Sequence, residues 1–325
     1  MKDLTLTTNQ PASAPSILVT GANGHLGTAL VNHLSATRNV IAAVRSQSAA
    51  DALSAFLSAR GAAADRVTIE IISYTDAAAL EALLVNCEAV VHLVGIIKEG
   101  PASSYFDAHE ATTQALLTAL AKRNDPLPST REISLCYLSI VGSHPTATNA
   151  CLASKGRAEQ MLLDSPHPSA IVQLPMVLGE GDYAAYAINQ QATKRLNVVF
   201  AKNARDQPIY AGDVIDAITA LLPTESNSPI NDRLILAGPE SVNKKQLLQR
   251  AAALRGRKTT VIGLPLLIAQ LFTQLVGKLS NNPPITPAML EILHHDDCFD
   301  ATRTCETLGI TRTSLDDMLE RVRTP

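Results

Sequence analysis

Three glycines spaced three residues apart follow the first apolar run of the chain. The run is Ile17–Val19, the glycines are Gly21, Gly24 and Gly27, and residues 26–34 continue with the apolar periodicity of a helix. In such a strand–turn–helix unit, the first glycine permits a tight exit from the strand, the second lets a phosphate approach the backbone, and the third lets the helix pack closely. The start of the helix offers unpaired N–H groups and the positive end of its dipole. The turn therefore predicts a phosphate-binding site; the alternative is a tight turn without a ligand.

Short apolar runs alternate with helical patterns along the N-terminal half. The runs lie at residues 17–19, 40–44, 67–72, 89–94, 133–138 and 170–174, and the helical patterns at 26–34, 49–59, 77–85, 104–123 and 152–163. Continuous apolar strands that alternate with helices predict a parallel sheet covered on both faces. We therefore expect an α/β fold with a doubly wound parallel sheet of the Rossmann type, which binds ligands beyond the carboxyl ends of its strands.

The alternation is lost in the C-terminal half. We expect residues 16–177 to form the dinucleotide-binding domain, with residues 207–238 returning to its sheet through strands at 208–213 and 233–237. Residues 1–15 are polar and are expected to be a flexible tail.

Residues 178–206 and 239–325 are expected to build a smaller, mainly helical C-terminal lobe that holds a substrate or a partner. Within it, residues 261–279 place apolar side chains opposite a polar stripe that recurs every four residues. This pattern predicts a helix docked on its own core; the alternative is a face for a membrane surface or an apolar substrate.

Composition excludes several classes of function. The chain has 325 residues, a net charge of −3, 3% aromatic residues and no Trp, so neither a basic surface nor stacking platforms for nucleic acid are expected. Five scattered cysteines without a C-x-x-C pair are typical of a reduced, intracellular protein. The chain has no clean run of eighteen apolar residues, so no membrane span is expected. We expect a cytoplasmic protein, with peripheral association at the inner face of a membrane left open.

The end of the second apolar run indicates which dinucleotide is bound. An acidic residue there favours NAD, whereas an Arg favours the 2′-phosphate of NADP. The run ends Val44-Arg45-Ser46, without a carboxylate, so Arg45 can pair with a phosphate and Ser46 can donate to it. NADP is therefore the predicted cofactor and NAD the alternative; in the simplest competing interpretation, Arg45 is a solvated surface cation.

Further cofactor contacts are expected from the turn and from the ends of the third and fourth strands, where the adenine and the back of the cofactor would lie. Together these residues are Gly21, Asn23, Gly24, His25, Leu26, Gly27, Arg45, Ser46, Ser73, Tyr74, Val94 and Gly95.

The glycine spacing resembles that of the extended or atypical short-chain dehydrogenase/reductase superfamily. Further stretches agree in their order along the chain: 90–99, 137–139, 154–155, 173–179, 210–214, 236–239 and 284–290. The set is most similar to the NAD(P)-binding branch that includes the accessory subunit of respiratory complex I and its bacterial relatives. The resemblance implies that Lys155, Pro175 and Val177 also contact the cofactor.

Active members of that superfamily use a Tyr-x-x-x-Lys pair with a Ser or Thr, in which the Tyr exchanges a proton with the substrate. The matching stretch of this chain keeps Lys155 but has Cys151 in place of the tyrosine. The hydroxyl group would come from Ser139 or Ser143, because Val141 occupies the position that aligns with the family's serine. A cysteine is shorter than a phenol, so standard Tyr-based chemistry is not expected, although a thiol beside Lys155 could carry a proton.

Other polar clusters have simpler interpretations. The run 294–298 (HHDDC) resembles a metal cluster, but consecutive residues of a helix point in different directions, so no metal site is expected. His92 lies within an apolar strand and is expected to be a core histidine. His144 and the stretch 180–182 follow strands near the expected mouth of the site, where they either touch a substrate or shape a loop.

Two functions stay open at this point. The first is an NAD(P)-binding protein without standard dehydrogenase chemistry, linked to quinone or respiratory-complex function. The second is an NADP-dependent reductase or epimerase that acts on a small or isoprenoid-like substrate, with Lys155, Cys151, Ser139 and Ser143 as its candidate catalytic residues.

Overall fold

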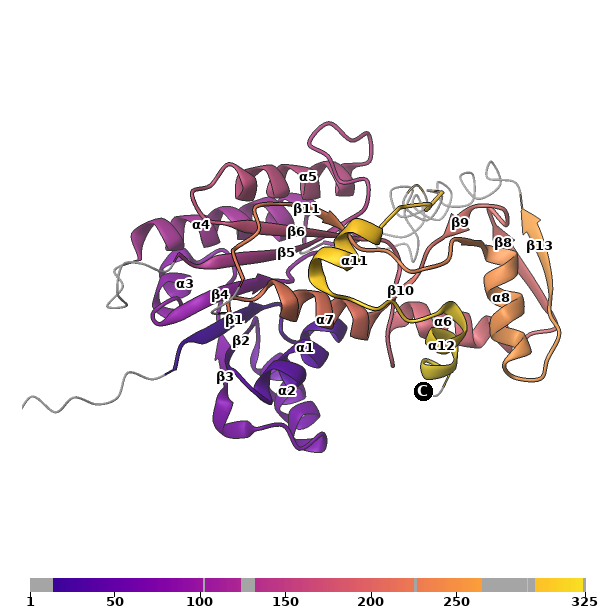
Figure 1. Ribbon diagram of the computed structural model, residues 1–325, viewed down its shortest axis with the longest axis horizontal. Helices are drawn as coiled ribbons and strands as arrows, with labels where there is room; N and C mark the ends of the chain where they lie inside the picture. The colour runs from indigo at the N-terminus through magenta and orange to yellow at the C-terminus, as the bar shows by residue number, and fades with distance from the viewer. Residues whose placement is uncertain are drawn as a thin grey trace, which may run out of the picture.

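A seven-stranded parallel sheet forms the centre of the molecule, with strand order β11-β6-β5-β4-β1-β2-β3 (Figure 1). The computed structural model describes residues 14–101, 103–123, 132–224, 227–264, 291 and 296–323. The strands are β1 (Ser16–Thr20), β2 (Asn39–Val44), β3 (Val67–Ile71), β4 (Cys87–His92), β5 (Ser134–Ile140), β6 (Ser169–Leu174) and β11 (Asp232–Ile235). The expected doubly wound parallel sheet is confirmed.

Helices cover both faces of this sheet because its strands carry apolar side chains on both faces. In β1, Ile17 and Val19 enter one buried cluster and Leu18 enters the other. Figure 1 shows α4 and α5 on one side of the sheet and α1 and α2 on the other. The first cluster is covered by α1 (His25–Ser35), α2 (Gln47–Ala59) and α7 (Ala211–Leu221), and the second by α3 (Ala77–Leu83), α4 (Thr112–Lys122) and α5 (Ala150–Leu163).

The C-terminal elements pack beside one end of the sheet (Figure 1). Three pairs of short strands occur here: β7 (Val177–Leu178) with β10 (Ile209–Tyr210), β8 (Leu196–Phe200) with β13 (Thr260–Leu264), and β9 (Arg205–Asp206) with β12 (Val242–Asn243). A third buried cluster joins α6 (Tyr183–Ala192), α8 (Lys244–Ala253) and α12 (Leu315–Arg321). The helix α11 (Thr302–Leu308) instead adds Cys305 to the first cluster, beside α7.

Two expectations for the C-terminal half are wrong. The strand expected at residues 208–213 does not join the central sheet: Ile209 and Tyr210 form β10, and α7 begins at Ala211. The cause is the helical spacing of the apolar residues that follow, which α7 buries against α1.

The helix expected from residue 261 is also wrong at its start, where Thr260–Leu264 form β13. Three consecutive β-branched residues favour a strand there, and β8 offers a parallel partner. The remainder of that expected helix, residues 265–279, lies outside the described residues, as does most of the expected tail. Among the helices that are described, none is both long and apolar enough to cross a membrane.

Candidate functional site

The glycine turn between β1 and α1 has the geometry that its sequence predicts. Gly21 has a φ of +74°, and a Cβ there would lie 3.2 Å from the backbone of Leu93. A Cβ on Gly27 would lie 2.4 Å from the Gly21 carbonyl oxygen, so α1 packs directly against the turn. Only glycine fits these two positions without a shift of the backbone.

The N-terminus of α1 is open to a ligand. Gly24 is its N-cap residue, no side chain caps the helix, and Asn23, Gly24 and His25 are exposed. A Cβ on Gly24 would meet only the Gly21 carbonyl oxygen, at 3.4 Å. The first N–H groups of a helix lack partners inside the helix, so this end can bind an anion. Leu26 is half-buried and packs against the first core cluster, away from that opening.

The residues expected around the adenine occupy different environments. Arg45 is exposed at the end of β2, and no described residue forms an ion pair with it. Ser46 caps α2, because its hydroxyl accepts a hydrogen bond from Ala49 N (3.3 Å). Ser73 is exposed and lies within hydrogen-bond distance of Thr75 (3.0 Å). The phenol of Tyr74 is buried and turns toward the glycine turn rather than toward solvent.

Lys155 is buried among backbone carbonyl groups. Its Nζ donates to Leu138 O (2.9 Å) and Val94 O (3.4 Å) and lies 4.4 Å from the centre of the Tyr137 ring. A Cβ on Gly95 would lie 2.8 Å from this Nζ, so Gly95 is the neighbour that leaves room for the amine. Burial lowers the pKa of Lys155 to about 8, and the nearby Cys151 and Glu159 partly offset that effect.

Cys151, at the position where the sequence resemblance leads us to expect a tyrosine, lies one turn before Lys155 on α5. Its side chain is completely buried, and its Sγ donates to Ile96 O (3.5 Å). Burial raises the pKa of the thiol to about 11, although the charge of Lys155 opposes this shift. The thiol is therefore protonated near neutral pH and points into the protein.

The candidate hydroxyl groups lie together near the end of β5. Ser139 and Ser143 are both buried, and the hydroxyl of Ser139 donates to that of Ser143 (3.3 Å). Val141 lies buried between them in sequence. His144 is exposed and lies within hydrogen-bond distance of Thr146 (2.8 Å). The structure thus brings the two serines together, and their catalytic role stays a prediction.

His109 is a buried residue near this site that the sequence interpretation missed. It lies in a π-helical turn, η2 (Phe106–Ala111), a helix form that is frequent at functional sites. Its Nε2 lies 3.1 Å from both the N and the O of Ile96, the residue whose carbonyl also accepts from Cys151. Burial and the charge of Lys155 lower the pKa of His109 to about 3, so the ring is neutral. Only its place inside a long helical pattern could have drawn attention to it.

His92 is a core histidine, as expected. It lies 2.7 Å from the hydroxyl of Thr20 and 3.3 Å from that of Thr112, and burial lowers its pKa to about 3. The described part of the chain contains no group of three residues that could hold a metal ion. His294 and His295 lie outside that part.

The segment after β6 shapes the far side of the opening. Pro175 and Val177 are half-buried, and Val177 belongs to β7. Asp182 caps α6, because its carboxylate accepts from Gly179 N (2.5 Å) and Ala185 N (2.6 Å). Glu180 accepts a hydrogen bond from Tyr210 (2.5 Å). The stretch 180–182 therefore holds a loop in place.

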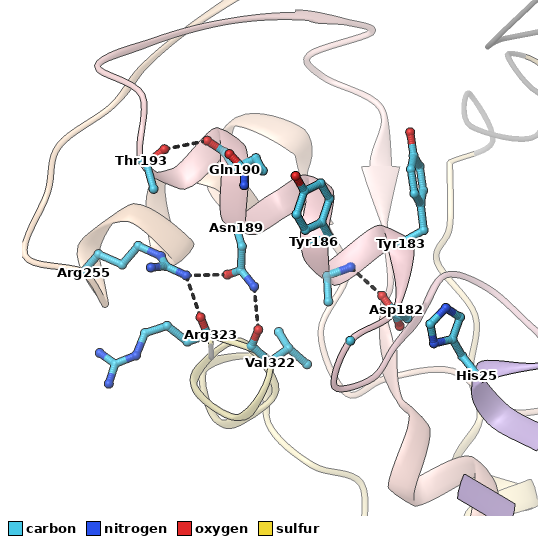
Figure 2. Close-up of a pocket in the computed structure, with 12 residues that line it drawn as sticks. His25, Asp182, Tyr183, Tyr186, Asn189, Gln190, Thr193, Arg255, Val322 and Arg323 are labelled. Carbon is cyan, nitrogen blue, oxygen red and sulfur yellow. Dashed lines mark hydrogen bonds between the residues drawn. The ribbon is translucent and has the colours of Figure 1, made fainter. Parts of the chain in front are cut away.

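A cavity of about 540 Å³ lies beside the glycine turn, between His25 and α6 (Figure 2). Figure 2 shows Tyr183 and Tyr186 projecting from α6 at its edge. Its floor is a polar network in which Asn189 donates to Val322 O (2.5 Å), and Arg255 donates to Asn189 Oδ1 and to Arg323 O (2.8 Å each). Cys151 and Lys155 are not among its lining residues.

One family model matches the first part of the chain. The model describes the NAD dependent epimerase/dehydratase family and matches residues 17–132, which run from β1 past the end of α4 and contain the glycine turn. Over these residues the chain is similar to the NAD-dependent epimerase/dehydratase family. No curated protein matches the sequence significantly.

Solved structures extend the likeness to that family's fold over nearly the whole chain. A UDP-glucuronic acid 4-epimerase from Bacillus cereus, in complex with UDP-glucuronic acid and NAD, has a TM-score of 0.68 at 17% identity, over 95% of this chain and 98% of that one. A UDP-N-acetylglucosamine 4-epimerase from Bacillus cereus has a TM-score of 0.66 at 16% identity, over 95% and 98%. The terminal R domain of the myxalamid PKS-NRPS biosynthetic pathway has a TM-score of 0.69 at 16% identity, over 97% and 90%. At these identities the likeness shows the fold alone.

Proposed function

We propose that the protein binds NADP(H) at the glycine turn and does not carry out Tyr–Lys dehydrogenase chemistry. The observation that carries the proposal is the contrast between the two halves of the site. The N-terminus of α1 is open, whereas the thiol at the tyrosine position is completely buried and hydrogen-bonded to Ile96 O.

The buried thiol is a poor substitute for a phenol for three reasons. Its side chain is shorter, its hydrogen bond to Ile96 O directs it inward, and its pKa of about 11 keeps the proton on sulfur. Lys155, in turn, donates to the carbonyl group of Leu138 in β5 and has a pKa of about 8. These residues support a site that holds a cofactor through Gly95 and Lys155 without transferring a proton at Cys151.

The preference for NADP rests on Arg45. Its guanidinium is exposed at the carboxyl end of β2, where no described residue forms an ion pair with it. Ser46 follows directly, although its hydroxyl also caps α2. The family model favours NAD-dependent proteins as a class, so a comparison of the two cofactors is the test of this part of the proposal.

We further propose a cytoplasmic protein that associates with a quinone-linked or respiratory assembly at the inner face of a membrane. Two features support this: the resemblance of the ordered motifs to the complex I accessory-subunit branch, and an apolar face on the β8–β13 pair. Leu196, Val198 and Ile262 are each about half exposed on these two strands. Co-sedimentation with vesicles, compared between wild type and a Val198→Ser/Ile262→Ser variant, tests the association; equal binding by the two proteins would count against it.

A second candidate, an NADP-dependent reductase or epimerase, is favoured by the cavity beside His25. Its volume of about 540 Å³ suits a small molecule. The polar groups of Asp182 and Asn189 in its wall are hydrogen-bonded within the protein. The rings of Tyr183 and Tyr186 are 81% and 58% exposed, so both offer aromatic surface to a ligand there. An apolar or isoprenoid-like substrate fits this wall better than a highly polar one.

One set of experiments separates the two candidates. Titration with NADPH and NADH, followed by thermal shift, should show binding of NADPH in either case; binding of neither cofactor would refute the central proposal. Under the first candidate, Cys151→Tyr should create or raise reductase activity with carbonyl substrates. Under the second, wild type is active and Cys151→Ser should abolish that activity while the affinity for NADPH is retained.

A further inference from the structure

Tyr74 connects three segments of the sheet's carboxyl edge through one oxygen atom. Its phenol accepts a hydrogen bond from Gly21 N (3.0 Å) and donates one to Ala43 O (2.8 Å). Ala43 O also accepts from Ala22 N (3.3 Å). The end of β1, the end of β2 and the loop after β3 therefore meet at a side chain that is only 5% exposed.

The orientation of the Gly21 peptide decides the shape of the whole turn. Its carbonyl oxygen accepts from Gly24 N (3.0 Å) and lies where a side chain on Gly27 would otherwise be. Gly21 adopts a φ of +74°. Because glycine has no Cβ, its backbone can also adopt many other conformations, so the residue alone does not hold the peptide in this orientation. A side-chain hydrogen bond to its N–H removes some of that freedom before a ligand arrives.

The phenol suits this role over the physiological pH range. Burial raises the pKa of Tyr74 above its usual value, and the hydrogen bond from Gly21 and the charge of Arg45 only partly oppose the shift. The hydroxyl thus keeps its proton and donates to Ala43 O while it accepts from Gly21 N.

We propose that Tyr74 is a positioning residue for the phosphate-binding turn, acting through Gly21 and not through contact with the adenine. The inference rests on the proposed binding of a dinucleotide. The proposal predicts a selective effect. Loss of the hydroxyl should lower the affinity for ligands that place a pyrophosphate on the turn, and should leave unchanged the affinity for ligands that occupy only the adenosine end. A residue that merely shaped the adenine pocket would affect both kinds of ligand equally.

The test is Tyr74→Phe, which keeps the buried ring and removes the two hydrogen bonds. Titrations use NADPH, which carries the pyrophosphate, and adenosine 2′-phosphate, which does not. We expect NADPH binding to weaken roughly tenfold, about the worth of one to two hydrogen bonds, and adenosine 2′-phosphate binding to stay within about twofold. The inference is overturned if the affinities for both ligands fall equally, or if neither affinity changes.

A matched control is Tyr105→Phe, because the Tyr105 phenol is also buried and donates to Ile97 O (3.1 Å) on another loop. It should lower the melting temperature to a similar extent without changing the ratio of the two affinities. Amide hydrogen exchange of the ligand-free protein supplies a second measurement, in which Gly21 N–H should exchange faster in Tyr74→Phe only. If wild type binds no dinucleotide, the proposed function fails; normal wild-type binding with unchanged affinities and unchanged Gly21 exchange in Tyr74→Phe overturns only the role of Tyr74.

Discussion

Gly24→Ala should separate dinucleotide binding from folding. Gly24 has a φ of −70° and a ψ of 163°, an extended conformation that alanine adopts freely. The added methyl group would meet only the Gly21 carbonyl oxygen, at an ordinary contact distance of 3.4 Å. The protein can therefore accommodate the methyl group, which would then occupy the space through which a phosphate reaches the first N–H groups of α1.

Two estimates give the expected sizes. As an N-cap residue, alanine stabilises the helix less than glycine does, by roughly 1 kcal/mol. Alanine also lowers the conformational entropy of the unfolded chain, which stabilises the folded protein by about 0.4–1 kcal/mol and offsets most of that loss. The melting temperature should thus change by less than about 4 °C. Loss of one charge-assisted hydrogen bond to the phosphate, about 1.5–3 kcal/mol, raises the Kd for NADPH roughly 10- to 150-fold.

Gly27→Ala is the contrasting variant. Its methyl group would lie 2.4 Å from Gly21 O and 2.9 Å from the carbonyl carbon of Ala22, both rigid backbone atoms. Displacement of α1 should cost about 1–3 kcal/mol, so this variant loses stability and binding together. Isothermal titration with NADPH and thermal melts of both variants supply the measurements. An unchanged NADPH affinity in a stably folded Gly24→Ala protein would refute the assignment of the turn as the phosphate site.

Three further predictions concern the cofactor and the interior. Arg45→Ala should weaken NADPH binding about tenfold or more and leave NADH binding unchanged, because only NADPH offers a 2′-phosphate to the guanidinium; equal losses in fluorescence titrations would contradict this. The pKa of Lys155 is about 8 in the folded protein and about 10.4 in an unfolded chain, so the unfolded state binds more protons between these values and stability should rise with pH there. In urea melts, the unfolding free energy of wild type relative to Lys155→Met should rise by on the order of 2 kcal/mol from pH 8 to 10. A difference between the two proteins that does not change with pH would count against a buried amine with a lowered pKa. Arg233→Met leaves the fully buried carboxylate of Glu159 without its ion-pair partner at 2.8 Å, which should cost about 3 kcal/mol of unfolding free energy. Adding Glu159→Gln should recover part of that loss, and no recovery would argue against an unpaired charge as its cause.

The central sheet could be predicted because its strands are continuous apolar runs. Each of the first six strands lies within two residues of its expected bounds, as for residues 133–138 against β5, Ser134–Ile140. A strand buried on both faces carries its own signal, since most of its side chains are apolar. The errors fall on short segments, β10 and β13, whose identity depends on pairing with β7 and β8 from elsewhere in the chain.

The candidate site was only partly predictable. The four-residue spacing of Cys151 and Lys155 places both on one face of α5, and the structure puts them close enough for each group to shift the pKa of the other. The direction of each head group did not follow from that spacing. The carbonyl groups that they contact belong to other segments, Ile96 O to the loop after β4 and Leu138 O to β5. His109 had no motif at all, and its approach to Ile96 depends on a π-helical turn.

By itself the sequence determined the sheet, the glycine turn and the lack of a tyrosine at position 151, because apolar periodicity and glycine spacing are local properties of the chain. Only the tertiary structure decided what the site's polar groups do. It buried the Cys151 thiol, turned Lys155 toward carbonyl groups and brought the Tyr74 phenol onto Gly21, 53 residues earlier in the chain. The physical reason is that hydrogen-bond partners and desolvation are set by neighbours distant in sequence, and no local pattern encodes them.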